Sequence, residues 1–278
     1  GIRTNTQYGK AMIASIDPTR ILEELDRDHI VIVAGFQGVT EDMDVTTLGR
    51  GASDLTAVAI AARLGAKRCE VYSDVDGIFT ADPNLVPEAR ILSEIGFEEM
   101  LEMASYGAKM NPRSIELAMV HNLPILVTSS FSQTSGTIIH QGAPMDSGVG
   151  ELRNRVRAIA TDGNVAKVTV SGIVDRPGIA AVLFEPLAKA GINVDIIVQN
   201  AGVRGTTDFT FTTARTELDK AEQIAREIAS DLDGGDVVSS VGLAKVSIVG
   251  TGMQDTPGYA AKMFRTLADD GINIDTIS

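Results

Sequence analysis

The sequence is poor in cysteine and in basic residues, and it has no long hydrophobic run. Cys69 is the only cysteine among 278 residues; this and the lack of a basic-then-apolar leader predict a cytoplasmic protein without an internal disulfide. Lys and Arg number 24 against 37 Asp and Glu, a formal net charge of −13, which argues against nucleic acid as a partner because duplex phosphates require clustered cations. Apolar stretches such as residues 30–34 are far shorter than the ~20 residues that span a bilayer, so no membrane partner is expected.

Patterns typical of several metal and hydrolytic sites are missing as well. His29, His121 and His140 lie far apart and no Cys-x-x-Cys is present, so neither a structural zinc site nor any other metal bound by protein ligands alone is predicted. No Gly-x-Ser-x-Gly elbow is present, which weakens a hydrolase hypothesis. The composition, 44% hydrophobic and 22% charged, is that of a folded globular protein of about two domains. If such an acidic chain binds anions, a few cations close to the site must outweigh the repulsion from its net negative charge.

The clearest organisational feature is an internal repeat. Residues 175–197 and 255–277 are identical at thirteen of 23 positions at a fixed offset of 80, including both Asp-x-Pro-Gly starts and both Gly-Ile-Asn turns. Each copy follows an alternating apolar run, at residues 167–171 and 245–249, that indicates a half-buried strand.

The first copy continues into a pattern that predicts a ferredoxin-like β-α-β-β-α-β unit. Its expected elements are a strand at 167–171, a helix between Asp175-x-Pro-Gly and Gly191, strands at 192–198 and 207–212, a helix at 216–232 and a strand at 237–241. The second copy stops at Ser278, before it could supply its remaining elements, so we expect the chain to end inside a domain.

Residues 1–140 alternate apolar β runs with helical patterns, which predicts an α/β layer fold with a mostly parallel sheet. Strands are expected at 30–34, 69–73 and 125–129, and helices at 18–27, 53–64, 97–105 and 112–121. Residues 141–150 are rich in Gly, Pro and small polar residues and mark the boundary between the two halves.

The first candidate site is the sequence Thr-Thr-Leu-Gly-Arg-Gly-Ala-Ser-Asp at residues 46–54. Ser53 is the expected N-cap of a helix, whose start offers free N–H groups and the positive end of the dipole, and Arg50 adds a cation that matches a carboxylate. The pattern predicts an anion site. Read alone it is more typical of an ordinary turn, because it is neither a dinucleotide fingerprint nor a Walker A loop.

The second candidate site follows the strand that ends at Ser73-Asp74. Asp74, Asp76 and Asp82 lie within nine residues and suit a Mg²⁺-nucleotide site beyond the carboxyl end of a strand; the alternative is a solvated turn in which Asp caps its own backbone. Lys109, in a Gly-Ala-Lys turn between two helices, fits either a phosphate contact or an ordinary exposed lysine.

In their order along the chain, these motifs resemble those of aspartate kinases (aspartokinases), and the resemblance covers essentially the whole chain. It rests on residues 46–54, on Ser-Asp-Val-Asp-Gly-Ile-Phe-Thr-Ala-Asp-Pro at 73–83, on Gly-Ala-Lys at 107–109 and on the two Asp-x-Pro-Gly repeats. It implies a three-layer amino-acid-kinase fold whose N-terminal part is missing, followed by ferredoxin-like ACT regulatory domains. The implied domains are the kinase at 1–145, a first ACT domain at 155–242 and a truncated second one at 243–278.

In that family ATP, with Mg²⁺, phosphorylates the side-chain carboxylate of L-aspartate to 4-phospho-L-aspartate, the first step toward lysine, threonine, methionine and diaminopimelate. The resemblance implies that Arg50 and Ser53 bind the substrate and that Asp54 orients catalytic lysines. The implied nucleotide contacts are Ser73, Asp74, Phe79, Asn84 and Lys109, of which Lys109 also serves catalysis. Such a site suits phosphoryl transfer, which needs positioning and charge neutralisation more than covalent help.

The sequence departs from the family pattern at several points. Ala52 stands where a second glycine is usual, Phe79 replaces a common tyrosine and Asn84 a common arginine. The family's Lys-Phe-Gly-Gly-Thr segment, with its phosphate-binding lysine, is missing before Gly1. Because that lysine would stabilise the transferring phosphoryl group, we expect the 278 residues alone to have little or no kinase activity.

For the ACT pair, the resemblance implies a homo-oligomer that binds lysine and/or threonine at the interface as allosteric effectors. The implied contacts are Asp175, Ala180, Asn193 and Gln199 in the first unit and Tyr259, Ala260, Asn273 and Ile274 in the second. The alternative is a non-catalytic amino-acid-sensing subunit, which would not need Arg50, Asp54, Asp74 and Lys109. A glutamate or acetylglutamate kinase is disfavoured by the tandem ACT units.

Overall fold

The computed structural model describes residues 1–278 except 109, 143–155, 202–204, 233–234 and 251–256. The chain divides into two compact units, each built from two stretches of sequence. Unit one comprises Gly1–Ala160 and Ser247–Thr256, and unit two comprises Thr161–Val246 and Pro257–Ser278. The expected α/β class is confirmed, whereas the division into domains at 1–145, 155–242 and 243–278 stays a prediction.

Unit one opens with a small sheet in the order β2-β1-β3-β4. Its strands are Ile2–Thr4 (β1), Ile13–Ile16 (β2), Gln37–Val39 (β3) and Val45–Thr47 (β4), and helix α1 spans Thr19–Leu25. β1 pairs antiparallel with β2 and parallel with β3, and β3 pairs antiparallel with β4. Gly38 is required in β3 because any larger residue would collide with the side chain of Thr4. The chain leaves β4 directly into the loop of the first candidate site.

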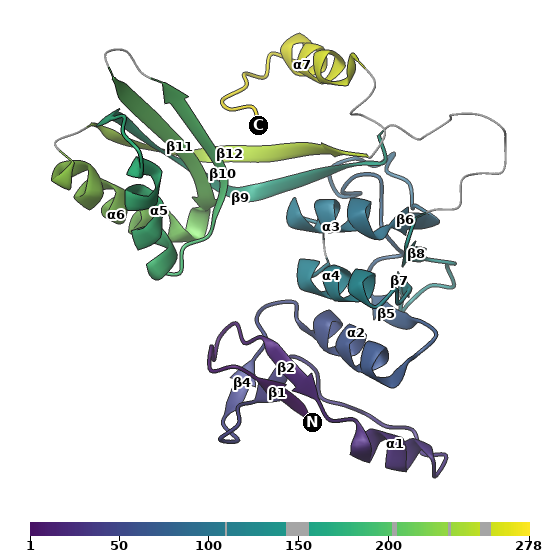
Figure 1. The fold of residues 1–278 in the computed structure, drawn as a ribbon. Helices are drawn as coiled ribbons and strands as arrows, with labels where there is room; N and C mark the ends of the chain where they lie inside the picture. The colour runs from purple at the N-terminus through teal and green to yellow at the C-terminus, as the bar shows by residue number, and fades with distance from the viewer. Residues whose placement is uncertain (109, 143–155, 202–204, 233–234, 251–256) are drawn as a thin grey trace. The chain divides into compact units, whose positions relative to one another are not determined.

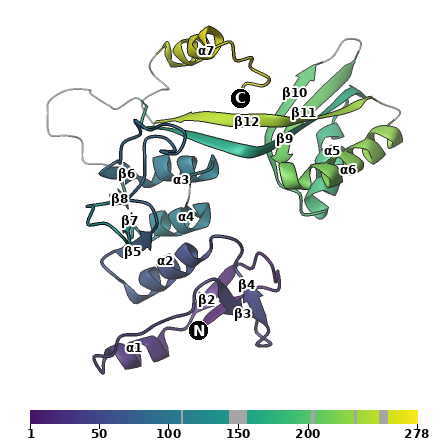
Figure 2. The same cartoon turned by 180° about the vertical axis from the view of Figure 1, so that it is seen from behind.

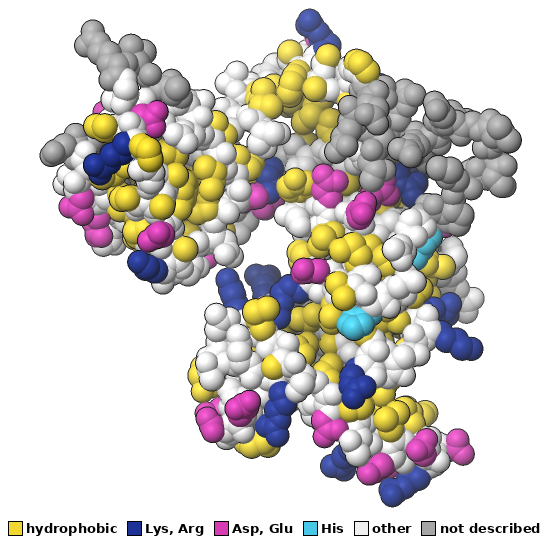
Figure 3. All heavy atoms as spheres, viewed as in Figure 1, with side chains coloured by type: hydrophobic (Ala, Val, Ile, Leu, Met, Phe, Trp, Pro, Cys, Tyr) yellow, Lys and Arg dark blue, Asp and Glu magenta, His cyan; other side chains and the backbone are white. Residues whose placement is uncertain are grey.

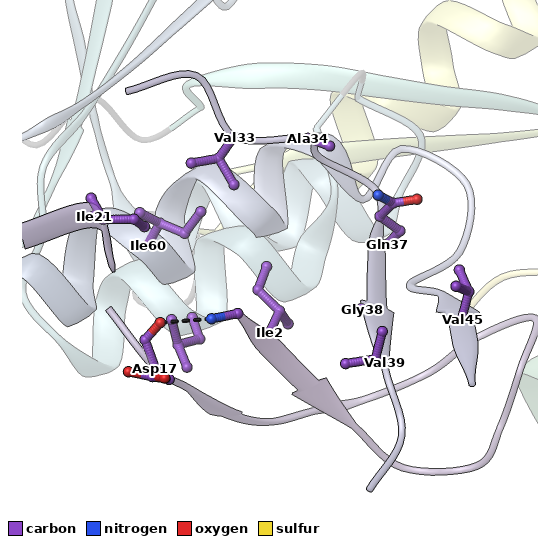
Figure 4. A pocket seen from close by; sticks show the side chains of 12 residues that line it. Ile2, Asp17, Ile21, Val33, Ala34, Gln37, Gly38, Val39, Val45 and Ile60 are labelled. Carbon is purple, nitrogen blue, oxygen red and sulfur yellow. Dashed lines mark hydrogen bonds between the residues drawn. The ribbon is translucent and has the colours of Figure 1, made fainter. Parts of the chain in front are cut away.

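The strand expected at residues 30–34 is absent, so this prediction is wrong. The segment pairs with no strand among the described residues, and the side chains of Ile30 and Ile32 are each 94% exposed. An apolar run favours a buried strand, but only backbone partners on a neighbouring strand make one. Instead, Val33 lies beside Ile21 and Ile60 on one side of a cavity of about 270 Å³, which Ile2 and Val39 close from the small sheet (Figure 4).

The second sheet of unit one has the order β5-β7-β8-β6. Its strands are Cys69–Ser73 (β5), Glu94–Gly96 (β6), Ile125–Ser129 (β7) and Thr137–His140 (β8), and its helices are Ser53–Leu64 (α2), Phe97–Ser105 (α3) and Pro112–Val120 (α4). β5 pairs parallel with β7 and β6 with β8, whereas β7 and β8 are antiparallel, so the sheet is mixed. Both views show α3 and α4 along one face of this sheet (Figures 1 and 2).

Local sequence explains where these helices begin and end. Gly65 ends α2 in the left-handed conformation at φ +64°, which is easily adopted only by glycine. Asn111 caps α4 by accepting the Arg113 N–H at 3.0 Å, and Pro112 occupies the first helical position, where no N–H is needed. The apolar residues of both helices recur at three- and four-residue spacing and fill the core, in which Met100, Ile115, Ile125 and Ile139 are fully buried.

Unit two contains the expected ferredoxin-like arrangement, with strand order β10-β11-β9-β12. Its elements are Ala158–Val174 (β9), Ile179–Lys189 (α5), Val194–Ala201 (β10), Thr206–Ala214 (β11), a 3₁₀ turn at Arg215–Glu217, Leu218–Asp231 (α6) and Val237–Val249 (β12). β11 pairs antiparallel with both β10 and β9. The two strands expected at 237–241 and 245–249 are one continuous strand, β12.

The core of unit two lies between the sheet and the helices α5 and α6. The Phe184 ring packs edge-on against Phe209 and Phe211, with centroids 6.0 and 5.6 Å apart, and Leu183 and Leu187 are fully buried. Full burial of one such side chain contributes about 1.5–3 kcal/mol. Phe184 and Leu187 are apolar positions shared by both copies of the repeat, and they contribute to the buried face of α5.

The second copy of the repeat forms helix α7 (Tyr259–Asp269). Gly258 precedes α7 at φ +109°, as Gly178 precedes α5 at φ +89°, so the two copies begin their helices in the same left-handed conformation. No residue of α7 is buried. Among the described residues, no helix combines the length and apolar character that a membrane crossing requires.

Candidate functional site

The loop between β4 and α2 turns sharply, and glycines make the turn possible. Gly49 and Gly51 have φ of +101° and +72°, conformations that residues with a Cβ rarely adopt. Ala52 does not need to be glycine, because its φ of −85° and ψ of 9° are open to alanine. It is fully buried in a small cluster with Ala11, Leu48 and Leu55. The departure at Ala52 is therefore accommodated by packing.

This turn exposes the predicted substrate residues at the start of a helix. Arg50 and Ser53 are exposed, and Asp54 is half-buried in the first turn of α2. The N-cap residue of α2 is Ala52, which makes no capping hydrogen bond through its side chain, so the first N–H groups and the positive dipole end of the helix remain available to an anion as far as the described residues go. The loop therefore combines one exposed guanidinium with a receptor for an anion.

Burial of Asp54 makes its charge unfavourable. Loss of solvent raises the pKa of the Asp54 carboxyl above its ordinary value. Burial likewise raises the pKa of the Cys69 thiol to about 11, with further contributions from the charges of Asp54 and Glu70. Asp54 at the start of α2 and Cys69 at the start of β5 therefore interact electrostatically, and a neighbouring cation would be favourable for Asp54.

The second candidate site lies where β5 and β7 end side by side. Ser73 pairs with Ser129 in the parallel register, and the Ser130 N–H donates to the Ser73 carbonyl at 2.8 Å. The Ser73 hydroxyl donates to Asp74 Oδ1 at 3.0 Å, and the Asp74 side chain is exposed. Because ligands of open α/β sheets lie beyond the carboxyl ends of parallel strands, these residues are placed to meet one.

The other two aspartates of this segment, Asp76 and Asp82, accept hydrogen bonds from other residues of the protein. Asp76 accepts a hydrogen bond from the Ser132 hydroxyl at 2.5 Å. Asp82 Oδ1 accepts the Asn84 backbone and side-chain N–H groups at 2.9 and 3.0 Å, the self-capping turn that was the alternative to a metal site. Within the described part of the chain, no group of three or more His, Cys, Asp and Glu side chains could hold a metal ion.

The remaining predicted nucleotide contacts differ in their burial and in their hydrogen bonds. Phe79 is partly buried and forms a β-bridge with Ile91, while Asn84 is exposed with its side chain bound to Asp82. Lys109 lies outside the described residues, between the turn at Gly107, with φ +114°, and buried Met110. The roles assigned to these residues stay predictions.

Sequence reasoning missed Arg113, which comes four residues after Lys109. Its guanidinium donates from Nη1 to the Leu48 carbonyl at 2.9 Å and from Nη2 to the Ala11 carbonyl at 3.0 Å. No local pattern could have found this, because the partners are 65 and 102 residues away in sequence.

The predicted effector contacts of the first ACT unit lie at two separate places on its sheet. Asp175 and Ala180 lie at the end of β9 and the start of α5, whereas Asn193 precedes β10. The register pairs Val194 with Thr213 and Thr213 with Ala166, so Val194, the residue after Asn193, is level with Ala166, about 26 Å along the sheet from Val174. One amino acid can touch both groups only where two such units meet.

Gln199 lies nearer to Asp175, toward the end of β10, and its amide donates to the Thr207 hydroxyl at 3.2 Å. In the second copy Tyr259 and Ala260 begin α7, and Asn273 and Ile274 follow it. These effector assignments stay predictions.

The two repeat copies exchange ion pairs in a reciprocal manner. Lys167, which precedes the first copy, lies 2.5 Å from Asp275 of the second. Lys245, which precedes the second copy, pairs with Asp195 of the first. Asp195 and Asp275 correspond in the repeat, and Lys167 and Lys245 each begin the apolar run before a copy, so each copy receives an ion pair from the run before the other.

On the face drawn in Figure 3, acidic side chains lie over both units rather than at one place. The net charge of −13 is a sum over the whole sequence and does not describe any one site. At a separation of more than ~10 Å such charges are largely screened at ordinary ionic strength, so nearby groups decide whether an anion binds.

Both units are similar to families of known proteins. A profile described as "Amino acid kinase family" matches residues 2–129, and one described as "ACT domain" matches residues 168–227 and 246–278. The aspartate kinase of Pseudomonas putida is 44% identical over 278 residues, which make up 100% of this chain and 67% of that protein. The chain belongs to the aspartate kinase family. The aspartokinase of Corynebacterium efficiens is 46% identical over 285 residues, with 100% of this chain and 66% of that protein covered. The chain thus spans about two thirds of the length of these curated aspartate kinases.

Solved aspartate kinase structures share the fold. Escherichia coli aspartokinase III in complex with aspartate and ADP (R-state) matches with a TM-score of 0.79 and 30% identity, over 99% of this chain and 61% of that chain. The same enzyme in complex with lysine and aspartate (T-state) matches with a TM-score of 0.72 and 30% identity, over 100% and 61%. The predicted combination of an amino-acid-kinase fold with ACT domains is therefore confirmed.

Proposed function

We propose that this chain is part of an aspartate kinase that transfers the terminal phosphoryl group of ATP to the side-chain carboxylate of L-aspartate. The observation that carries the proposal is the loop before α2, where Arg50 and Ser53 are exposed beside half-buried Asp54. The same motif belongs to a chain that is 44–46% identical over its whole length to curated aspartate kinases. The product would be 4-phospho-L-aspartate, the first intermediate toward lysine, threonine, methionine and diaminopimelate.

Arg50 and the start of α2 would bind the substrate together. The planar guanidinium can bind one carboxylate of L-aspartate through two parallel hydrogen bonds. The open N–H groups of α2 and the Ser53 hydroxyl would receive a second group, which leaves the side-chain carboxylate free to act as nucleophile. Asp54 would hold the ammonium groups of catalytic lysines in place, since a half-buried carboxylate with a raised pKa favours a cationic partner.

ATP would lie beyond the ends of β5 and β7, with Ser73, Asp74, Phe79, Asn84 and Lys109 around it. The donor set fits a Mg²⁺ ion that arrives with the nucleotide, because Mg²⁺ uses phosphate oxygens, water and one or two carboxylates rather than a protein cage. Asp74 is the exposed carboxylate at this edge. When bound, the ion would neutralise charge on the phosphates.

The ACT units would make the enzyme sensitive to lysine and/or threonine. A site that combines Asp175 of one unit with Asn193 of another requires side-by-side association, so we propose a homo-oligomer. The effector must bind two states of the enzyme unequally to regulate it. The sensing-only alternative is less well supported, because the kinase profile matches residues 2–129.

Because the chain spans about two thirds of its relatives, we expect slow turnover or none from these 278 residues alone. Substrate binding is therefore the sharper test. Calorimetric titration of the chain with L-aspartate should show binding, and Arg50→Gln should weaken it at least tenfold, since a charge-assisted bidentate contact contributes about 1.5–3 kcal/mol. Arg20→Gln, at an exposed position on α1, is the matched control and should leave the affinity unchanged. No binding by the parent chain, or equal binding by the Arg50 variant, would refute the proposal.

A further inference from the structure

Arg113 joins two segments that are far apart in sequence. Its two terminal nitrogens reach the carbonyls of Leu48 and Ala11 at 2.9 and 3.0 Å. Both acceptor residues are buried, at 1% and 0% exposure, so water cannot replace the guanidinium without opening the small cluster around them. Arg113, itself partly buried, is therefore tied to the interior of unit one through both terminal nitrogens.

One of these acceptors belongs to the substrate loop. Leu48 is the last residue before Gly49, where the chain enters the left-handed conformation and then presents Arg50. The backbone of the loop is otherwise fastened by the Leu48 N–H to the Phe36 carbonyl at 2.9 Å and by the Ala52 N–H to the Gly49 carbonyl at 3.2 Å. Two glycines make this loop intrinsically mobile, so an anchor at Leu48 determines where Arg50 lies.

The other acceptor holds the opposite side of the same loop. The Ala11 N–H donates to the Thr47 carbonyl at 2.9 Å, and Ala11 is fully buried. Arg113 thus clamps residues 47–48 directly and through Ala11. A lysine, with one point charge on a flexible stem, cannot reproduce this two-pronged geometry.

The position of Arg113 is itself fixed by the start of α4. Asn111 Oδ1 accepts the Arg113 N–H at 3.0 Å, and the Ser114 hydroxyl donates to the Asn111 carbonyl at 2.6 Å. Lys109, the predicted phosphate contact, is only two residues before the cap. The start of α4 therefore places the guanidinium that holds the substrate loop.

We propose that Arg113 is a positioning residue that holds the Arg50 loop in its aspartate-binding conformation without touching the substrate. The inference rests on the proposed function for its ligand. It also adds an electrostatic effect: Arg113 binds neutral carbonyl groups and has no carboxylate partner among the described residues, so its positive charge favours an anion at the loop.

The test compares Arg113→Met and Arg113→Lys with the control Arg63→Met. Arg63 also donates from its guanidinium to a main-chain carbonyl of unit one, that of Ile16 at 3.2 Å, but it lies in the last turn of α2, at the opposite end of that helix from the loop. Hydrogen exchange measured by mass spectrometry should show faster deuterium uptake at residues 46–54 in Arg113→Met and unchanged uptake at residues 125–129. Loss of hydrogen bonds to a charged group should weaken L-aspartate binding about tenfold or more, with partial recovery in Arg113→Lys.

The outcomes separate the inference from the proposed function. Unchanged exchange at residues 46–54 in Arg113→Met overturns the inference whether or not aspartate binds. Faster exchange with unchanged aspartate affinity also overturns it, because the residue would then be only structural. If the parent chain binds no aspartate, the proposed function fails, and the exchange arm still decides whether Arg113 orders the loop. An equal loss of affinity in Arg63→Met would show a general loss of stability and contradict positioning.

Discussion

Cys69 provides a chemical reporter beside the candidate site. It is the only cysteine in the sequence, it is 6% exposed at the start of β5, and the charge of Asp54 acts on it. Thiol alkylation proceeds through the thiolate, so its rate depends on both accessibility and pKa. A single measurement therefore probes the packing and the electrostatics of this part of unit one.

The expected protection follows from the pKa. Burial and two nearby carboxylates raise the pKa of Cys69 from 9.0 to about 11. At pH 8 the thiolate fraction falls from about 9% to about 0.1%, which slows alkylation about 90-fold before any steric effect of burial. The same shift stabilises the folded state below pH 9, and this stability, about 3 kcal/mol, is lost as the pH rises to 11, because the unfolded thiol ionises first.

The assay is the rate of reaction with iodoacetamide at pH 8, followed by mass spectrometry, in buffer and in concentrated urea. Asp54→Asn should speed the native reaction, since it removes a charge that raises the Cys69 pKa, whereas Asp42→Asn, at an exposed position in unit one, should not. A native rate within about tenfold of the rate in urea would refute the reasoning, because the pKa alone demands more protection. Equal rates in Asp54→Asn and the parent would refute the electrostatic part.

Further predictions concern the packing of each unit. Leu183→Ala, at a fully buried position of α5, should reduce the stability of unit two by about 2–5 kcal/mol in urea unfolding followed by NMR, whereas Val182→Ala, at 44% exposure, should cost less than about 1 kcal/mol. Gly136→Ala should destabilise unit one by more than about 1 kcal/mol, because the new methyl group would collide with the Val127 carbonyl at a φ of +67°. Gly142→Ala has a similar φ of +76° but open space around it, so an equal loss of stability would show that the collision does not matter.

Much of the fold follows from local sequence, because the spacing of the apolar residues and the residues that bound each element indicate the same helices and strands. The expected boundaries at 53–64 and 97–105 match α2 and α3, and those at 69–73 and 125–129 match β5 and β7. In each case an apolar repeat of the right period is bounded by a glycine or polar turn residue. The ferredoxin-like unit could be predicted for an additional reason, since a repeated sequence marks a repeated structural unit.

The rest depends on contacts that no local window contains. Strands of three residues, such as β1 and β6, are too short to show any period. Residues 30–34 have the composition of a buried strand but no partner among the described residues, so the composition predicted the wrong structure. The site shows the same division. The sequence predicted Arg50, Ser53 and Asp54 because they lie within five residues of one another. The contacts of Arg113 and the electrostatic effect of Asp54 on Cys69 exist only in the folded chain.

The remaining question is how so acidic a chain attracts an anionic amino acid and a nucleotide. Several cations of the protein form ion pairs with carboxylates. Arg157 lies 3.3 Å from Glu99, and Arg68 lies 2.5 Å from Glu70. In the described part of the chain, neither Arg50 nor Arg113 has a carboxylate oxygen within 4.0 Å. Remote acids are screened beyond ~10 Å, while two uncancelled guanidinium groups act at the loop itself. At the loop, the two arginines outnumber the one carboxylate in the first turn of α2, that of Asp54, so local charge favours an anion although the chain as a whole is acidic.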